Sequence, residues 1–272
     1  MVNQMSGSNP LNMTCRVCAA HCDLYDVVDF NKSCEEARGT FLGLSGKPIY
    51  YVRCSACGFC SAPEIASWSP DQFHREIYNA DYIKVDPDHE IDRPKDGARK
   101  LLKNFAKIGK SLQHLDYGGG KGELSQILRE NGWNSTSHDP FYKPGEDFES
   151  IGQYDLITAF EVFEHVPDPR DLMKRLQKLL APGGAIYFTT QVSDGSIVEN
   201  GRLTWWYAAP RNGHISLFTK NSLQRLGLDF GFSLLSIDDG SHLYFKELPT
   251  WSSKVRKWPR AKRFSLFGGF NR

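Results

Sequence analysis

Two pairs of cysteines near the N-terminus have the spacing of metal ligands. Cys15 and Cys18 form one Cys-x-x-Cys pair, and Cys54 and Cys57 form a second. Four thiolates presented by two tight turns match the tetrahedral geometry of a structural zinc site. A catalytic zinc keeps one position open and usually includes His or Glu among its ligands, so we expect this zinc to stabilise the fold.

The remaining cysteines leave alternatives to this ligand set. All seven cysteines lie between residues 15 and 60, and Cys22, Cys34, Cys60 and His21 are further possible ligands. A disulfide framework is disfavoured, because the start of the chain lacks the basic end and apolar centre of a secretory signal. Buried free cysteines would be the other explanation. The gap between the pairs exceeds the roughly 15–20 residues of a compact zinc ribbon. We therefore expect an insertion with strands near residues 24–30 and 49–52.

A glycine-rich stretch at residues 115–123, Leu-Asp-Tyr-Gly-Gly-Gly-Lys-Gly-Glu, is the second chemical signal. Its flanks predict a strand, a tight turn and a helix, an arrangement that presents backbone N–H groups to a nucleotide-like ligand. A dinucleotide fingerprint requires Gly or Ala three residues after its second glycine, but here Glu123 follows Gly120 at that distance. Asp116 would lie poorly beside a pyrophosphate and suits a ligand with ammonium and sulfonium groups.

Further candidate ligand residues follow at the ends of later predicted strands. Residues 134–138 predict a strand that ends at Asp139, where a carboxylate about 20 residues after the glycines accepts hydrogen bonds from ribose hydroxyls. Residues 153–158 predict a buried strand that runs into Phe160 and Glu161. Strands that alternate with helices predict an α/β fold with a parallel, doubly wound, Rossmann-like sheet, whose ligand loops lie at the carboxyl ends of the strands.

Three motifs, in this order, resemble those of class I S-adenosylmethionine-dependent methyltransferases. The glycine stretch is similar to the first motif of that family. Glu-Val-Phe-Glu-His at residues 161–165, with a following Pro, resembles a later motif, and Leu-Ala-Pro-Gly-Gly at residues 180–184 resembles a third. The resemblance covers residues 95–247. It implies an enzyme that uses S-adenosylmethionine and closes its sheet with an antiparallel pair of strands.

The resemblance also implies a role for individual residues that match the family motifs. The residues expected to contact the cofactor are Asp116, Gly118 and Gly120 at its methionine part, Asp139 at its ribose, Phe160 and Glu161 beside it, and Asp147 or Phe148 near its adenine.

A narrower resemblance concerns the acceptor. A cysteine-knuckle domain fused to this fold is similar to methyltransferases that act on nucleotide-linked sugars or surface polysaccharides, in which the zinc module helps to shape the substrate site. Trp205-Trp206-Tyr207 and the segment Asn-Gly-His-Ile-Ser-Leu-Phe at residues 212–218 resemble a segment of that group. Because sugar faces stack on aromatic rings, these aromatics have a physical use in such a site.

Three side chains are candidates for acid–base catalysis. Methyl transfer requires alignment of the nucleophile with the methyl group, and a base that frees the nucleophile can assist it. His214 is the first candidate, because an ordinary imidazole titrates near neutral pH and this one follows a glycine in an expected cofactor-facing loop. His165 is the second, and Tyr207 is a weaker one. The alternative for both histidines is a structural role in ordering their loops.

The chain is expected to divide into three parts. Residues 1–94 form an N-terminal zinc-binding domain that ends in a linker at residues 86–94, residues 95–247 the methyltransferase domain, and residues 248–272 a basic tail. The tail either contacts an anionic lipid, phosphate or partner or is simply solvated, and the second alternative is favoured because blocks of like charge are commonly disordered. A net charge of +1 gives no reason to expect nucleic acid or membrane binding. No apolar run reaches the roughly 20 residues of a membrane helix, and we expect a cytoplasmic protein.

Function is predicted at two levels. The first prediction is transfer of a methyl group from S-adenosylmethionine to a small, sugar-like molecule, such as a nucleotide-linked sugar or a surface-polysaccharide precursor. Methylation of a quinone, lipid or other natural product is the alternative on the same fold. From a different class, the cysteine knuckles and basic tail also fit an RNA- or protein-binding module with a degenerate cofactor site, although intact Asp116, Gly118 and Asp139 argue against degeneracy. The sequence leaves the oligomeric state open.

Overall fold

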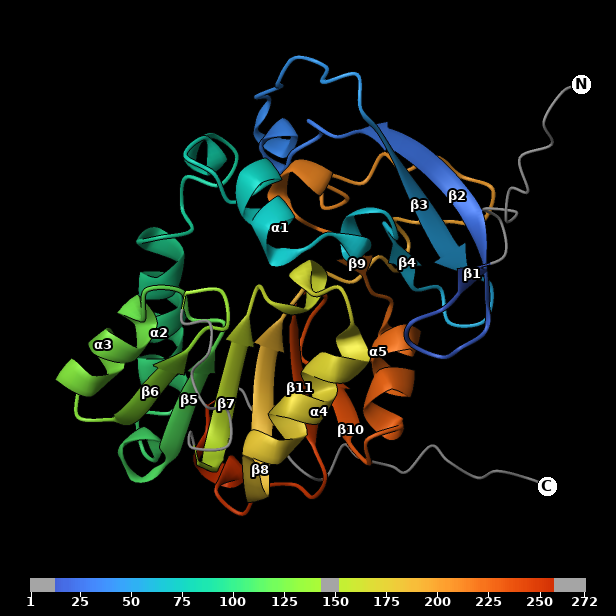
Figure 1. Ribbon diagram of the computed structural model, residues 1–272. Helices are drawn as coiled ribbons and strands as arrows, with labels where there is room; N and C mark the ends of the chain where they lie inside the picture. Colours follow the sequence, from blue (N-terminus) through green and yellow to red (C-terminus); the bar gives the residue numbers. More distant parts are fainter. Residues whose placement is uncertain (1–12, 143–151, 257–272) are drawn as a thin grey trace, which may run out of the picture.

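A computed structural model describes residues 13–142 and 152–256. These residues form a larger sheet of six strands and a smaller sheet of five, which lie one above the other in Figure 1. The expected adenine contacts at Asp147 and Phe148, and most of the predicted basic tail, lie outside the described residues.

The larger sheet has the strand order β10-β11-β8-β7-β5-β6. Its strands β5 to β8 run parallel, whereas β11 pairs antiparallel with both β8 and β10. This confirms the predicted parallel strands and their antiparallel end. The strands are β5 (Gln113–Tyr117), β6 (Asn134–His138), β7 (Tyr154–Phe160), β8 (Leu180–Thr189), β10 (Ser233–Ser236) and β11 (Ser241–Phe245).

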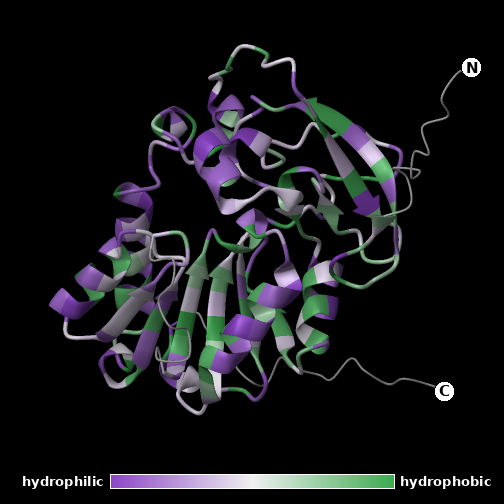
Figure 2. Cartoon of the chain, in the orientation of Figure 1, coloured by the Kyte–Doolittle hydropathy of each residue, from purple (hydrophilic) through white to green (hydrophobic). Residues whose placement is uncertain are grey.

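Helices cover both faces of the larger sheet. One face packs against α2 (Asp92–Asn104) and α3 (Glu123–Glu130), with buried Leu101 and Leu128 in the shared core. The other face packs against α4 (Pro169–Leu179) and α5 (Lys220–Leu228) in a second core. Figure 2 shows hydrophobic segments along the central strands and hydrophilic residues on the outer side of α4. The sheet is therefore doubly wound, as predicted.

Local sequence signals explain where these helices begin. Asp168 caps α4, because its side chain accepts hydrogen bonds from the backbone N–H groups of Arg170 and Asp171, and Pro169 occupies the first turn. Thr219 and Ser222 form a reciprocal capping box at the start of α5. Among the helices that the structure describes, none has the length and apolar character needed to cross a bilayer.

The smaller sheet has the order β1-β2-β3-β4-β9. Its strands are β1 (Met13–Thr14), β2 (His21–Asp29), β3 (Pro48–Cys54), β4 (Cys60–Ser61) and β9 (Ser216–Leu217). The expected strands in the insertion between the cysteine pairs correspond to β2 and β3. Below the sheet lies α1 (Pro70–Glu76), whose Phe73 is buried.

One strand of the smaller sheet comes from the second half of the chain. β9 pairs with β4, and residues 197–217 share a core with the N-terminal strands and α1. The N-terminal module therefore includes a segment that the boundary at residue 94 assigns to the methyltransferase domain. Residues 86–94 also differ from the expected linker, because α2 begins at Asp92 and the side chain of Arg93 forms two hydrogen bonds with Asp86.

Candidate functional site

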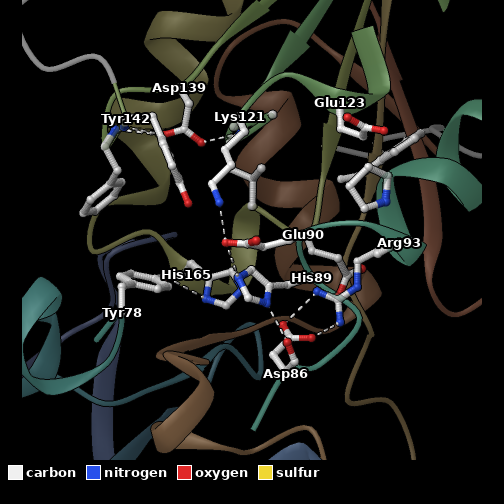
Figure 3. A pocket seen from close by; sticks show the side chains of 18 of the residues that line it. Tyr78, Asp86, His89, Glu90, Arg93, Lys121, Glu123, Asp139, Tyr142 and His165 are labelled. Carbon is white, nitrogen blue, oxygen red and sulfur yellow. Dashed lines mark hydrogen bonds and ion pairs between the residues drawn. The ribbon is translucent and has the colours of Figure 1, made fainter. Parts of the chain in front are cut away.

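A cavity of about 650 Å³ lies between the carboxyl ends of β5, β6 and β7 and the N-terminal module (Figure 3). Its wall on the sheet side consists of the glycine turn at residues 116–124, the loop at residues 139–142 and residues 160–166. Its opposite wall consists of residues from 74 to 94. All six cofactor residues expected from the sequence line this cavity: Asp116, Gly118, Gly120, Asp139, Phe160 and Glu161.

Asp116 lies beneath the glycine turn at the end of β5. Its carboxylate is 3% exposed and accepts a hydrogen bond from the Thr158 hydroxyl at 2.9 Å. Burial raises the pKa of Asp116 to about 7. A Cβ atom at Gly119 would lie 2.2 Å from its Oδ2 atom, so only glycine lets the turn pass so closely over the acid. A cationic group in the cavity would favour the ionised form of this carboxylate.

Gly118 adopts a left-handed conformation that its neighbours enforce. Its φ angle is +74°, and a Cβ atom would lie 2.5 Å from a methyl carbon of Val162. The loop that follows β7 therefore packs directly on the turn that follows β5. This close packing requires glycine at position 118 for space as well as for backbone conformation.

Asp139 joins two loops at the neighbouring strand end. Its Oδ2 atom accepts a hydrogen bond from the Gly120 N–H at 2.8 Å, and its Oδ1 atom accepts one from the Phe141 N–H at 2.8 Å. The Tyr142 N–H also donates to Oδ1, at 3.3 Å. A carboxylate has about four acceptor positions, so one remains for a hydroxyl of a ribose. The adjacent rings of Phe141 and Tyr142 line the same side of the cavity.

Glu161 has a strained backbone at the end of β7. Its φ angle is +53°, which is uncommon for a residue other than glycine. The Thr189 hydroxyl fixes this conformation, because it accepts from the Glu161 N–H at 2.9 Å and donates to Glu161 Oε1 at 2.8 Å. Strain of this kind commonly accompanies functional positions. Glu161 lines the cavity, and its two carboxylate oxygens contact the hydroxyls of Thr189 and Tyr207.

Two ion pairs involve residues of the cavity wall that were predicted to form a linker. Asp86 and Arg93 form a bidentate pair at 2.7 and 2.9 Å, and Lys121 of the glycine turn reaches Glu90 at 2.7 Å. Figure 3 shows Glu90, Arg93 and Asp86 across the cavity from Asp139, with Lys121 reaching toward Glu90 from the side of Asp139. Residues 86–93 contain several charged side chains, which could have indicated a functional wall. The Pro and Asp residues of this stretch are also typical of a linker, and the linker was the interpretation chosen.

The three acid–base candidates lie at different depths. His165 lines the cavity, and its Nδ1 atom donates to the Gly213 carbonyl at 3.2 Å and lies 3.3 Å from the Tyr78 hydroxyl. His214 is buried behind it, with the ring centroids 4.9 Å apart, and its Nδ1 atom donates to the Tyr207 carbonyl at 2.8 Å. Tyr207 is also buried. The structure thus brings the three together, but only His165 reaches the cavity wall.

Burial governs the protonation of these groups. It lowers the pKa of His165 to about 4 and, with the neighbouring imidazole, that of His214 well below its usual value. It also raises the pKa of Tyr207 well above its usual value. Both imidazoles are therefore neutral at physiological pH, and each retains a nitrogen lone pair.

The expected aromatic segment does not line the cavity. The rings of Trp205 and Tyr207 pack in the N-terminal core, and Trp206 is 41% exposed outside it. The aromatic side chains of the cavity instead include Tyr78 and Phe141, whose rings make an edge contact with centroids 5.8 Å apart. The sequence signal for this wall is the run of aromatic residues between positions 68 and 82: Trp68, Phe73, Tyr78 and Tyr82.

The four predicted zinc ligands form one cluster. Their sulfur atoms all lie within 4.8 Å of one another, with 3.7 Å between Cys15 and Cys57 and 3.5 Å between Cys18 and Cys54. Zinc–sulfur bonds of about 2.3 Å in a tetrahedron place sulfurs roughly 3.8 Å apart. The donor set therefore fits a zinc ion.

Hydrogen bonds from side chains to backbone carbonyls connect the cysteine cluster with the loop and helices that pack on the larger sheet. Arg16 donates to the Pro167 carbonyl in the loop after His165, and Arg170 of α4 donates to the Val17 carbonyl at 2.9 Å. The Thr219 hydroxyl at the start of α5 donates to the Cys57 carbonyl at 2.6 Å. A metal held here would therefore fix the position of the His165 loop.

Comparison with known proteins identifies relatives of part of the chain. Over part of the chain, the protein is similar to ubiquinone biosynthesis O-methyltransferases, with 33% identity to that of Erwinia tasmaniensis and 50% to that of Acinetobacter baylyi. These matches cover 28% and 15% of the chain and only 41% and 18% of the relatives.

A comparison with solved structures finds an O-methyltransferase family protein from Burkholderia thailandensis and human N-acetylserotonin methyltransferase. Their TM-scores are 0.46 and 0.43, each at 17% identity. The matches cover 66% and 64% of the chain, and 65% and 59% of those proteins. A family model described as a methyltransferase domain matches residues 88–237. Because this match spans more than half of the chain, the protein belongs to the family of S-adenosylmethionine-dependent methyltransferase domains.

Proposed function

We propose that the protein transfers the methyl group of S-adenosylmethionine to a small molecule bound in the cavity. The observation that carries this proposal is the convergence of Asp116, the turn from Gly118 to Gly120, and Asp139 on one cavity. These groups match the chemical parts of the cofactor, because a buried acid would face its cationic amino acid part and a second acid would bind its ribose.

The chain's own residues would bind and orient both substrates. The cofactor, when bound, supplies a methyl group activated by a positively charged sulfur. Asp116 and the N–H groups of the turn hold its amino acid end, and Asp139 fixes the ribose. Glu161 and His165 lie farther along the same wall, where the acceptor would approach. Alignment of two bound groups in one cavity supplies much of the rate acceleration in such transfers.

We further propose that the acceptor is compact. The cavity of about 650 Å³ must hold the cofactor as well as the reacting part of the acceptor. A nucleotide-linked sugar fits if its sugar enters and its nucleotide remains outside, and the ring of Tyr78 offers a face for stacking. The alternative acceptor is a quinone-like aromatic molecule, which is favoured by the similarity to the ubiquinone biosynthesis O-methyltransferases.

His165 is proposed as the group that accepts a proton from the acceptor. It is neutral, it lines the cavity, and its Nδ1 atom is held by the Gly213 carbonyl. His214, the first candidate from the sequence, packs against the ring of His165 from behind and would support it. We also propose that zinc at Cys15, Cys18, Cys54 and Cys57 is structural, because all four ligand positions would be filled by the protein.

Calorimetric titration with S-adenosylmethionine and with its demethylated product tests the cofactor. We expect binding of one equivalent to the full chain. No binding at millimolar concentration would refute the proposal and favour the binding-module alternative. Incubation of the protein and cofactor with a panel of UDP-hexoses, dTDP-hexoses and catechols, followed by mass spectrometry, tests the acceptor. Methylated hexose supports the sugar proposal, and methylated catechol supports the quinone alternative.

A further inference from the structure

Glu164 is the most deeply buried acid in the described part of the chain. Its relative exposure is 0%, and it lies next to His165 behind the cavity wall. The Tyr207 hydroxyl donates a hydrogen bond to its Oε1 atom. Its Oε2 atom is buried and has no hydrogen-bond partner among the described residues. A buried carboxyl with a free oxygen is costly unless it serves a purpose or carries a proton.

Two side chains of the cavity wall lie close to this carboxyl. The Tyr207 hydroxyl that binds Glu164 also lies 3.5 Å from Oε2 of Glu161. Nε2 of His165 lies 4.0 Å from the same Oε1 atom of Glu164 that accepts from Tyr207. Catalytic hydrogen bonds commonly tighten only when the substrate is bound. Glu164 therefore links the two cavity-facing groups that are best placed to take up a proton.

The charge state of this cluster favours proton sharing over metal binding. Donor atoms of Glu164, His165 and His214 lie within 4.8 Å of one another. A divalent ion would require an ionised carboxylate, but burial, reinforced by the nearby Glu161, raises the pKa of Glu164 well above its usual range. The raised pKa of Glu164 favours a protonated carboxyl, and the lowered pKa values of His165 and His214 favour neutral imidazoles beside it.

We propose that Glu164 is a positioning residue of the transfer site. It joins Glu161 and His165 into one proton-sharing network, because it reaches Glu161 through the Tyr207 hydroxyl and His165 directly. This inference rests on the proposed methyl transfer. When an O–H or N–H bond of the acceptor breaks, its electron pair forms the bond to the methyl group, the methyl–sulfur pair stays on sulfur, and the proton binds to Glu161 or His165. A proton on Glu161 is donated to the Tyr207 oxygen, whose own O–H donates to Glu164, and a proton on His165 Nε2 is donated to Glu164 Oε1.

Other charged groups also act on this network and belong to its pH dependence. Glu161 at the end of β7 and Tyr207 in the segment before β9 face Glu164 directly. His214 faces His165 from that same segment. From the opposite wall, Asp86 and Arg93 act on His165 at longer range.

The first experiment detects the shared proton without any acceptor. Infrared spectroscopy of the full-length protein at about pH 9 should show the band of a protonated carboxyl, because Asp116, with a pKa of about 7, is ionised there. Glu164→Gln should abolish this band, and the exposed Glu130→Gln variant should keep it. Persistence of the band in Glu164→Gln, or its absence from the wild type, would overturn the proposal.

The second experiment measures turnover with whichever UDP-hexose, dTDP-hexose or catechol is methylated in the screen. Glu164→Gln should lower kcat by roughly 100-fold, change the pH dependence of kcat and leave cofactor affinity unaltered. Tyr207→Phe, which cuts one side of the network, should also change the pH profile. If kcat falls by one constant factor at every pH in both variants, the role is merely structural and the proposal fails.

Two controls separate this inference from the function on which it rests. Failure of the wild type to bind S-adenosylmethionine defeats the proposed function, whereas the infrared result concerns Glu164 alone. Metal analysis of a Cys54→Ser variant addresses the competing explanation. We expect no zinc in that variant. If the Cys54→Ser variant instead retains a full equivalent of zinc, and this zinc is lost when His214 is also replaced by alanine, then Glu164, His165 and His214 form a metal site. That result would overturn the proton-sharing role.

Discussion

Replacement of Asp116 by asparagine should separate cofactor binding from stability. Asparagine has the same shape and can still accept the hydrogen bond from Thr158. In the wild type, burial raises the pKa of Asp116 from 3.8 to about 7. The unfolded chain therefore releases this proton at lower pH than the folded protein does. The stability of the wild type must fall as pH rises from about 4 to about 7.

The size of this effect follows from the shift in pKa. Each unit corresponds to about 1.4 kcal/mol, so ionised Asp116 costs ~4 kcal/mol above pH 7. This cost shrinks to below ~2 kcal/mol at about pH 5, where the folded form is protonated. Asp116→Asn should therefore be more stable than the wild type at about pH 8, and the difference should narrow by more than half at about pH 5.

Urea unfolding at both pH values measures the stability, and calorimetry with S-adenosylmethionine measures the affinity. We expect Asp116→Asn to bind the cofactor roughly 10- to 100-fold more weakly, because a hydrogen bond to a charged group contributes about 1.5–3 kcal/mol. Asp155→Asn is the matched control, since Asp155 accepts a backbone hydrogen bond from Gln113 at the opposite end of the sheet. Equal stability of Asp116→Asn and the wild type at both pH values, or unchanged cofactor affinity, would refute this account of Asp116.

Three further predictions concern the metal, the turn and the cavity wall. Cys54→Ser should lose about one equivalent of zinc by elemental analysis, whereas Cys34→Ser, outside the cluster, should retain it; no zinc in freshly purified wild type would contradict the site. Gly118→Ala should abolish cofactor binding in calorimetry, because the alanine methyl group would lie 2.5 Å from the side chain of Val162. Normal cofactor binding would show that the turn tolerates a side chain at this position. Arg93→Met should lower the midpoint of urea unfolding by leaving the buried carboxylate of Asp86 without its partner, and Arg99→Met, whose ion pair is exposed, should not.

The sequence predicted those parts of the site that depend on local backbone geometry. The glycine turn, Asp139 and Phe160-Glu161 are each attached to the end of a strand, and parallel strands bring their carboxyl ends to the same edge of a sheet. Strand and helix periodicity therefore sufficed to place these residues around one cavity. The cysteine cluster was predictable for a related reason, because zinc geometry dictates the spacing within each pair.

The opposite wall of the cavity could not be predicted in this way. Residues 74–94 reach the cavity through tertiary contacts, such as the ion pair between Asp86 and Arg93, that leave no periodic pattern. Likewise, nothing local in the sequence indicates that β9 pairs with β4. This long-range pairing explains why the aromatic segment at residues 205–207 packs in the N-terminal core instead of lining the cavity.

The placement of β9 connects the cysteine cluster with the acid–base groups. β4 follows Cys57 and pairs with β9, and His214 lies just before β9 in the chain. The backbone N–H of Ile215 donates to the Glu164 carbonyl, and the Ser216 hydroxyl donates to the Val166 carbonyl, so the same segment also holds the loop of His165. A shift of β4 caused by loss of the metal would therefore reach both histidines through a few hydrogen bonds. For this reason, a zinc ion bound at the cysteine cluster would help to hold the proposed acid–base groups in position, although the cluster is remote from the cavity.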